Sequence, residues 1–177
     1  MSENIKDVFV TLAKYNAMAN KDAVKVLEGL ESSKLTEDLG SYFGSILGLL
    51  NHQLASDIGW LKMLGENVSE LDFILPLLEE FEIERLPPKE IHWKTLSEYN
   101  SVRIKVDEVL ERMVTTLSPE QYLTEFTIEG RRGKFTTIVW RNLLLLFNHH
   151  IHHRGGVSLL LDQLGIENNF SSLLARA

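Results

Sequence analysis

The chain has 177 residues, 44% of them hydrophobic and 24% charged, which is the size and balance of one globular domain over residues 1–177. Its formal net charge of -7 leaves no basic surface for phosphates, so nucleic acid is not an expected partner. Because the chain has no cysteine, disulfides and thiolate ligands are excluded, and a transition metal would need histidine or carboxylate ligands.

The N-terminal segment MSENIKDVFVTLAKYN predicts the first helix, over residues 4–30, because Ile5, Val8 and Leu12 recur at helical spacing. The segment is acidic and amphipathic, unlike a signal peptide, and no apolar run approaches the roughly 18 residues of a membrane span. We therefore expect a cytoplasmic protein with no membrane partner.

A second helix is predicted over residues 41–64, where apolar residues again follow the helical period. Gly44, Gly48 and Gly59 lie within it, and each glycine costs about 1 kcal/mol in a helix interior. The glycines indicate either close helix packing or ordinary tolerance, and the sequence does not separate the two.

The connection over residues 65–92 should hold a short helix before the segment ERLPPKE, since a double proline cannot continue a helix. A third helix is predicted over residues 95–117. The segment LTEFTIEGRRGKFTTI, residues 123–138, alternates apolar and polar residues on either side of GRRG and predicts a small hairpin.

The fourth helix should run from Thr136 to Gln163 or Leu164, with Gly165 as its C-terminal cap. Four long amphipathic helices predict an all-α protein, a four-helix bundle with short connecting helices and a small hairpin before the fourth helix. The connections before the third and fourth helices are long enough for at least one crossover.

Four of the six histidines lie within NHHIHHRGG, inside the apolar fourth helix. At 100° per residue, His153 falls on the apolar face, whereas Asn148 and His152 turn away from it. His149 and His153 are four residues apart and can meet one ion, and His150 with His153 is the competing pair.

A third ligand should come from a neighbouring helix. His52 lies between two leucines on the apolar face of the second helix, whereas His92 follows the proline segment and should be exposed. A single inward histidine is more often a core residue that is hydrogen-bonded to the protein. Several buried imidazoles without partners cost about 1 to 3 kcal/mol each, so a shared divalent ion is favoured. The sequence thus predicts a metal site of His52, His149 and His153.

Three segments resemble the DinB/YfiT-like superfamily. FNHHIHHRGG is similar to the signature N-H-x-x-H-H-R-G-Q, and LNHQLASDIGWLKML resembles the family's second-helix histidine followed by Trp eight positions later. KYNAMAN resembles its first-helix pattern Tyr-Asn-x-x-Ala-Asn. The resemblance spans nearly the whole chain.

The resemblance implies an up-down-down-up bundle, often dimeric, that holds a divalent metal with His52, His149 and His153. It settles the choice between His149 and His150. Gly156 stands where the family usually has Gln, so substrate details do not transfer.

Arg154 and Gly155 also match the signature. We expect Arg154 to form a structural ion pair, with Asp57 as one candidate partner, the alternative being a solvated side chain, and we expect Gly155 to allow close approach of another backbone.

Three histidine ligands leave a coordination position open, which is typical of catalytic metal sites. Zn or Ni is the favoured metal, and Fe or Mn also binds imidazole. Because the relatives include thiol S-transferases, the resemblance implies a metal-dependent transferase or hydrolase acting on a small-molecule thiol or electrophile. Asp57 and Tyr15 are candidates for the general base, although a salt bridge and a core phenol are the more ordinary roles for them.

The alternative is a non-catalytic, stress-associated metal-binding or interaction protein with a structural metal, whose fourth ligand would come from His150 or a partner subunit. A plain helical bundle without metal would leave the histidine cluster unexplained. Phe147 and Ile151 are expected to be exposed off the core face of the fourth helix, which favours a homodimer, although packing beneath a loop would equally account for them.

Overall fold

The computed structural model of the chain describes residues 4–81, 83, 86–87, 89–130 and 133–171. The protein is mostly helical with a small two-stranded sheet, as the sequence predicts. In chain order, its elements are α1 (Ile5–Leu27), α2 (Ser32–Thr36), α3 (Ile46–Asn67), the 3-10 helix η1 (Ser69–Ile74), α4 (Leu75–Leu78), α5 (Leu96–Thr116), the 3-10 helix η2 (Gln121–Leu123), β1 (Glu125–Gly130), β2 (Gly133–Ile138) and α6 (Val139–Gln163).

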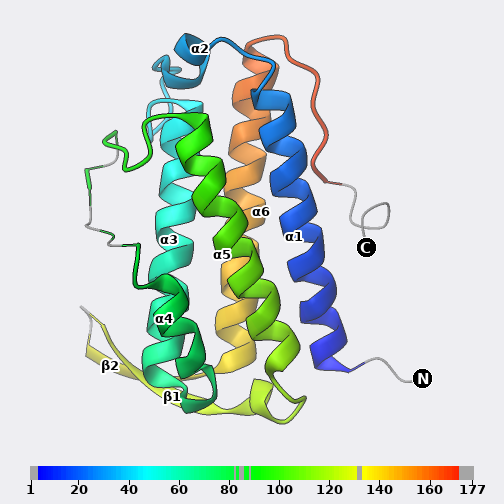
Figure 1. Cartoon of the computed structure of the whole chain (residues 1–177), viewed down its shortest axis with the longest axis vertical. Helices are drawn as coiled ribbons and strands as arrows, with labels where there is room; N and C mark the ends of the chain where they lie inside the picture. Colours follow the sequence, from blue (N-terminus) through cyan, green and yellow to red (C-terminus); the bar gives the residue numbers. More distant parts are fainter. Residues whose placement is uncertain (1–3, 82, 84–85, 88, 131–132, 172–177) are drawn as a thin grey trace.

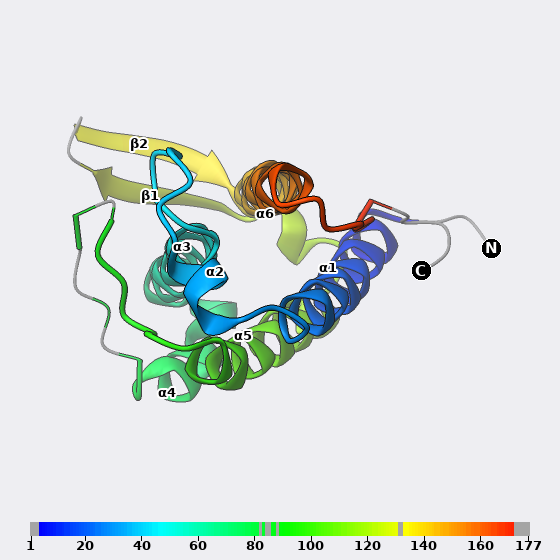
Figure 2. The same ribbon diagram turned by 90° about the horizontal axis from the view of Figure 1, so that it is seen from above.

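Helices α1, α3, α5 and α6 lie side by side around a common core (Figures 1 and 2). In Figure 1, α1 and α6 run from the bottom to the top, and α3 and α5 run in the opposite direction. In Figure 2, α6 and α5 lie on opposite sides of the group, with α1 and α3 between them. The short helices η1 and α4 form the predicted helical segment of the connection between α3 and α5.

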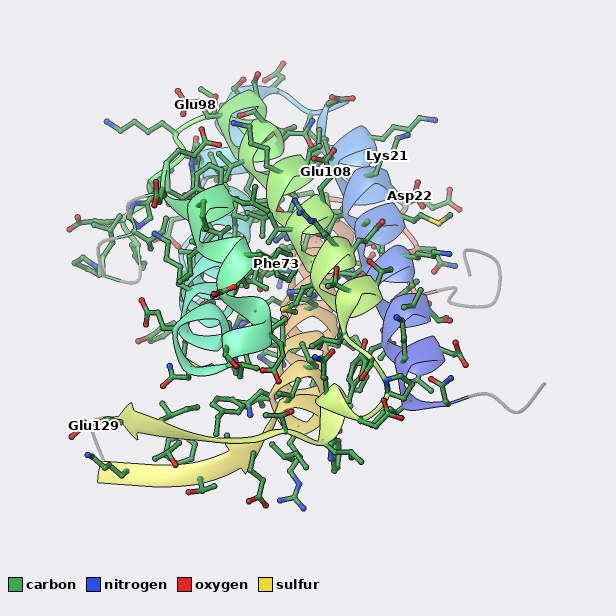
Figure 3. The ribbon with its side chains drawn as sticks, turned by 60° about the horizontal axis from the view of Figure 1, so that its bottom comes forward. Lys21, Asp22, Phe73, Glu98, Glu108 and Glu129 are labelled. Carbon is green, nitrogen blue, oxygen red and sulfur yellow. The ribbon has the colours of Figure 1, made fainter. Side chains whose placement is uncertain are left out.

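Local capping begins the helices at defined residues. Asn4 and Asp7 form a reciprocal capping box at α1, and Thr95 and Glu98 form another at α5. Figure 3 shows Glu98 at the start of α5. Gly165, with a φ of 72°, follows α6 as the predicted cap. These caps satisfy backbone groups that the helix ends would otherwise leave unpaired.

The second predicted helix begins five residues later than expected, at Ile46. Gly44 adopts a φ of 78° and its amide donates to the Ser41 carbonyl, so residues 41–44 form a turn. The Ser45 side chain then accepts from the Gly48 amide and caps α3. Gly44 therefore belongs to the turn and not to the helix.

The predicted hairpin is present, with Glu125 paired to Ile138 and Gly130 to Gly133. It lies across the bottom of the helices, and Glu129 marks its far end (Figure 3). Arg131 and Arg132 of the predicted GRRG loop lie outside the described residues, as does Pro88 of the double proline. Because β2 runs directly into α6, that helix begins at Val139 and not at 136.

Candidate metal centre

Three histidines from two helices converge, at the middle of α6 and in the first half of α3. His52 lies on the second turn of α3, and His149 and His153 lie on consecutive turns of α6. One nitrogen from each ring can be chosen so that all three lie within 4.8 Å of one another. The ring centroid of His153 lies 4.7 Å from that of His52 and 4.2 Å from that of His149. The structure therefore brings together the three residues of the predicted triad.

Aromatic rings hold the three imidazoles in place. Phe43, just before α3, stacks on His52 with centroids 4.0 Å apart and meets His153 edge-on at 5.8 Å. Trp60, two turns further along α3, lies 5.9 Å from His149. These rings shield the imidazoles from water on one side while leaving His52 and His149 only half-buried.

Burial keeps the three imidazoles neutral at pH 7. It lowers the pKa of His149 to about 4 and that of His153 to about 3, against 6.5 for an ordinary histidine. Burial also lowers the pKa of His52, although the charge of Asp57 opposes the shift. Neutral imidazole is the metal-binding form. The buried Nδ1 of His149 has no hydrogen-bond partner among the described residues. A divalent ion would therefore fit this donor set.

The other histidines of the cluster point elsewhere. His150 is completely buried, and its Nε2 lies 2.6 Å from the Asp57 carboxylate. His152 is exposed, as expected.

The expectation that His92 is exposed is wrong, because His92 is half-buried and lines the pocket beside His52.

Behind the triad, a cluster of buried charges crosses the core. Asp57 of α3 binds both His150 and Arg103 of α5, and Arg103 also contacts Asp107 at 2.8 Å. The Asp57 carboxylate is only 1% exposed. Burial alone would raise the pKa of Asp57, but the neighbouring His150 and Arg103 outweigh it and lower the pKa. Asp57 is absent from the pocket lining, which argues against its role as a general base.

The predicted pair of Arg154 with Asp57 is wrong. Arg154 instead donates to Asn16 at 2.7 Å and to Asn20 at 3.5 Å, and its guanidinium lies 5.1 Å from the Tyr15 ring centroid. Both asparagine amides donate to Asp107, which joins Arg154 to the charge cluster. Asp57 is already occupied by partners from α5 and α6, so Arg154 is held by α1.

Tyr15, the other candidate base, donates its hydroxyl to the Phe170 carbonyl at 2.7 Å. It therefore anchors the segment after α6 and lies outside the pocket lining. Gly155 also differs from expectation, because among the described residues no heavy atom other than its chain neighbours and the nearby backbone of α6 lies within 4 Å of the position of an added Cβ. The close approach occurs at Gly156, where a Cβ would lie 2.9 Å from Leu49.

A pocket of about 660 Å³ opens beside His52. Its walls come from the turn before α3, from α3 itself and from the segment before α5, and include Phe43, Ser56 and His92. The Asn51 side chain accepts from the Trp93 amide at 2.8 Å and donates to the Trp93 carbonyl at 2.9 Å. This two-way bond fixes the segment bearing His92 against α3, so the pocket is preformed.

A second cavity of about 680 Å³ lies between α1 and α5. Lys21, Asp22 and Glu108, labelled in Figure 3, belong to its lining. No histidine lines this cavity, so the pocket beside His52 is the better candidate for a metal-dependent active site.

The geometry defines a class: a mostly helical protein with a candidate three-histidine metal centre beside an open pocket. The comparisons with known proteins give the family. A model of the DinB family matches residues 1–174, and the chain belongs to that family. The chain is also similar to Protein DinB from Bacillus subtilis (strain 168), with 26% identity over 163 residues that cover 91% of this chain and 88% of that protein. The resemblance inferred from the sequence motifs is thereby confirmed.

None of the helices in the described part of the chain combines the length and the apolar character that a membrane crossing requires.

Proposed function

We propose that this DinB-family protein is an up-down-down-up four-helix bundle that binds one divalent metal ion through His52, His149 and His153. The single observation that carries the proposal is the convergence of three imidazole nitrogens within 4.8 Å of one another. Zn or Ni is the favoured ion, and Fe or Mn is also compatible with imidazole ligands.

We further propose that the protein is a metal-dependent enzyme of the thiol S-transferase or hydrolase type. A bound divalent ion supplies a Lewis acid that lowers the pKa of a water or thiol at its open position. The chain's own residues support this use. The imidazoles need not lose a proton at pH 7, and the pocket beside His52 gives a small-molecule thiol or electrophile access to the site.

A structural metal with four protein ligands is less well supported. His150, the candidate fourth ligand within the chain, is completely buried and its Nε2 is engaged by Asp57. The bond to Asp57 therefore holds the His150 ring away from the triad. The remaining source of a fourth ligand would be a partner subunit. A homodimer and a cytoplasmic location stay predictions.

The test is metal analysis of protein purified without a histidine tag. We expect one equivalent of divalent metal, lost in His52→Ala, His149→Ala and His153→Ala. His152→Ala is the matched control, because it removes an exposed imidazole from the same cluster. It should keep the metal. Circular dichroism of each variant checks that the fold remains.

Two further measurements separate catalysis from a structural role. In protein loaded with Co(II), an added thiol should produce a sulfur-to-metal charge-transfer band if a coordination position is open. Chelation should leave the helices folded, because the core does not depend on the ion. Global unfolding on chelation together with no thiol band would refute the enzymatic proposal and favour the structural one.

A further inference from the structure

An exposed tyrosine lies at the opening of the pocket beside His52. Tyr42 belongs to the pocket lining although it is 73% exposed, and its ring meets the Phe43 ring edge-on with centroids 5.0 Å apart. Phe43 in turn stacks on His52. Single exposed aromatic rings are ordinary on protein surfaces, but this ring extends the aromatic wall of the triad out to solvent. Tyr42 therefore offers an aromatic surface to a ligand that enters the pocket.

A carboxylate lies at the same opening. Glu90 is exposed and lines the pocket, and its backbone amide donates to the Pro87 carbonyl at 3.0 Å, so the chain turns there. In the described part of the chain, no ion pair involves the Glu90 carboxylate. Its negative charge is therefore available to a ligand.

The neighbouring lysine does not compensate this charge. The Lys89 side chain lies 3.5 Å from the position that a Cβ would take at Gly44, which holds the segment before α5 against the turn that bears Tyr42. The Lys89 ammonium, however, bonds to Asp38 at 2.6 Å. The described residues that line the pocket include no lysine and no arginine. The opening thus combines an aromatic ring with an uncompensated carboxylate, and both attract a cation.

We propose that the pocket selects a substrate with an ammonium group, and that Glu90 and Tyr42 are the residues that recognise it. The proposal rests on the proposed function, because the thiol or electrophilic end of the substrate must reach the triad. The ammonium group then lies at the opening, where Glu90 pairs with its charge and the Tyr42 ring adds a cation–π contact. The charge of a bound divalent ion acts mainly on the thiol end of any ligand. The far end of the ligand therefore decides the preference.

Three six-carbon thiols that differ only in the charge of their far end test this preference. They are 6-mercaptohexyltrimethylammonium, 6-mercaptohexanol and 6-mercaptohexanoate. The chain is long enough to reach Tyr42 from the triad, because the rings of His52, Phe43 and Tyr42 follow one another at 4.0 Å and 5.0 Å. At pH 8 the two charged ends keep their charge, whereas an ordinary imidazole is neutral.

The readout is the sulfur-to-metal charge-transfer band of the Co(II)-loaded protein, which gives a dissociation constant for each thiol. We expect the ammonium thiol to bind about tenfold more tightly than the carboxylate thiol, with the neutral thiol between them. Glu90→Gln should reduce that ratio about threefold. Glu108→Gln is the matched control, because it removes an exposed carboxylate that lines the other cavity, and it should leave the ratio unchanged.

The aromatic contribution is tested at Tyr42. Tyr42→Leu should also reduce the ratio about threefold, whereas Tyr42→Phe keeps an aromatic ring and should reduce it less. A second measurement needs no metal. In metal-free protein, hexyltrimethylammonium should shift the backbone amide NMR signals of Tyr42 and Glu90 at lower concentrations than hexanoate does.

The outcomes separate this inference from the proposed function. A band with all three thiols but no order by charge, or an order that Glu90→Gln and Tyr42→Leu leave unchanged, would overturn the inference and leave the proposed function standing. Absence of the band with all three thiols would overturn the proposed function, and the selection of an ammonium substrate would fall with it.

Discussion

The buried carboxylate of Asp57 gives the sharpest stability prediction. Asp57→Asn keeps the size of the side chain and removes its charge. Asp57 accepts two charge-assisted hydrogen bonds, from Arg103 and from His150, and both lose their anionic acceptor in the variant. Charge-assisted bonds contribute about 1.5 to 3 kcal/mol and neutral ones about 1 kcal/mol, so two such changes cost about 3 kcal/mol. Arg103 stays partly compensated, because Asp107 still contacts it.

The assay is urea unfolding of the metal-free protein, followed by circular dichroism. A loss of about 3 kcal/mol should also lower the melting temperature by roughly 6 to 12 °C for a chain of this length. Glu80→Gln is the matched control. It removes the same charge from an ion pair with Lys105 at 2.8 Å, but both side chains are more than half exposed. Its expected cost is below about 1 kcal/mol.

The same variant predicts a pH dependence with a definite sign. The pKa of Asp57 in the folded protein lies below its ordinary value of 3.8, despite the opposing effect of burial, because His150 and Arg103 stabilise the carboxylate. The wild type therefore gains its full advantage over Asp57→Asn above about pH 3.8, and this advantage shrinks as the pH falls further. A loss for Asp57→Asn no larger than that for Glu80→Gln, or an advantage that is independent of pH, would refute the electrostatic account.

Three further variants test local structure in the same unfolding assay. Gly48→Ala should destabilise by about 2 kcal/mol or more, because its Cβ would lie 2.2 Å from the Phe43 carbonyl oxygen, whereas Gly59→Ala meets nothing within 4 Å and should stabilise by about 1 kcal/mol. Equal effects at the two glycines would contradict the packing argument. Tyr15→Phe should cost about 1 kcal/mol and speed hydrogen exchange at the segment after α6, because it removes the bond to the Phe170 carbonyl. Unchanged exchange there would show that the hydroxyl does not anchor the segment.

The helical period was sufficient to place the four long helices and to indicate His52 and His153, whereas the choice of His149 over His150 came from the family resemblance. The 100° rotation per residue correctly put His153 on the apolar face and turned Asn148 and His152 outward. The helical period did not predict where the helices begin, because single residues determine those positions. The left-handed Gly44 and the direct passage of β2 into α6 are local geometries that hydrophobic periodicity does not encode.

Of the two α6 side chains expected off the core face, only one is exposed. Ile151 is exposed, as expected, but Phe147 is buried and packs against Phe9 with ring centroids 6.1 Å apart. The helical wheel places Phe147 off the centre of the core face, yet α1 packs against α6 closely enough to cover it. The width of the buried face depends on the neighbouring helix, and the sequence of one helix does not contain that information.

The buried charge cluster was missed, although the sequence carries a signal for it. On α1, Asn16 and Asn20 occupy core positions within the repeat that contains Phe9, Ala13, Ala23 and Leu27. On α5, Arg103 falls between Tyr99 and Val106 in the same way. A polar residue at an inward position of a helix must find a buried partner. Such positions on two different helices therefore predict contacts between those helices, but the pairing depends on how the helices pack.

The five residues from His149 to His153 show how one turn and a half of helix serves three environments at once. His149 and His153 face α3 and complete the triad with His52, while His150 faces the core and binds Asp57. Ile151 and His152 face outward and are exposed. The bond between His150 and Asp57 links α6 to α3, the helix that carries His52. Removing the His150 ring should therefore weaken metal binding at the proposed site without removing a proposed ligand, so single substitutions can separate the roles of these histidines.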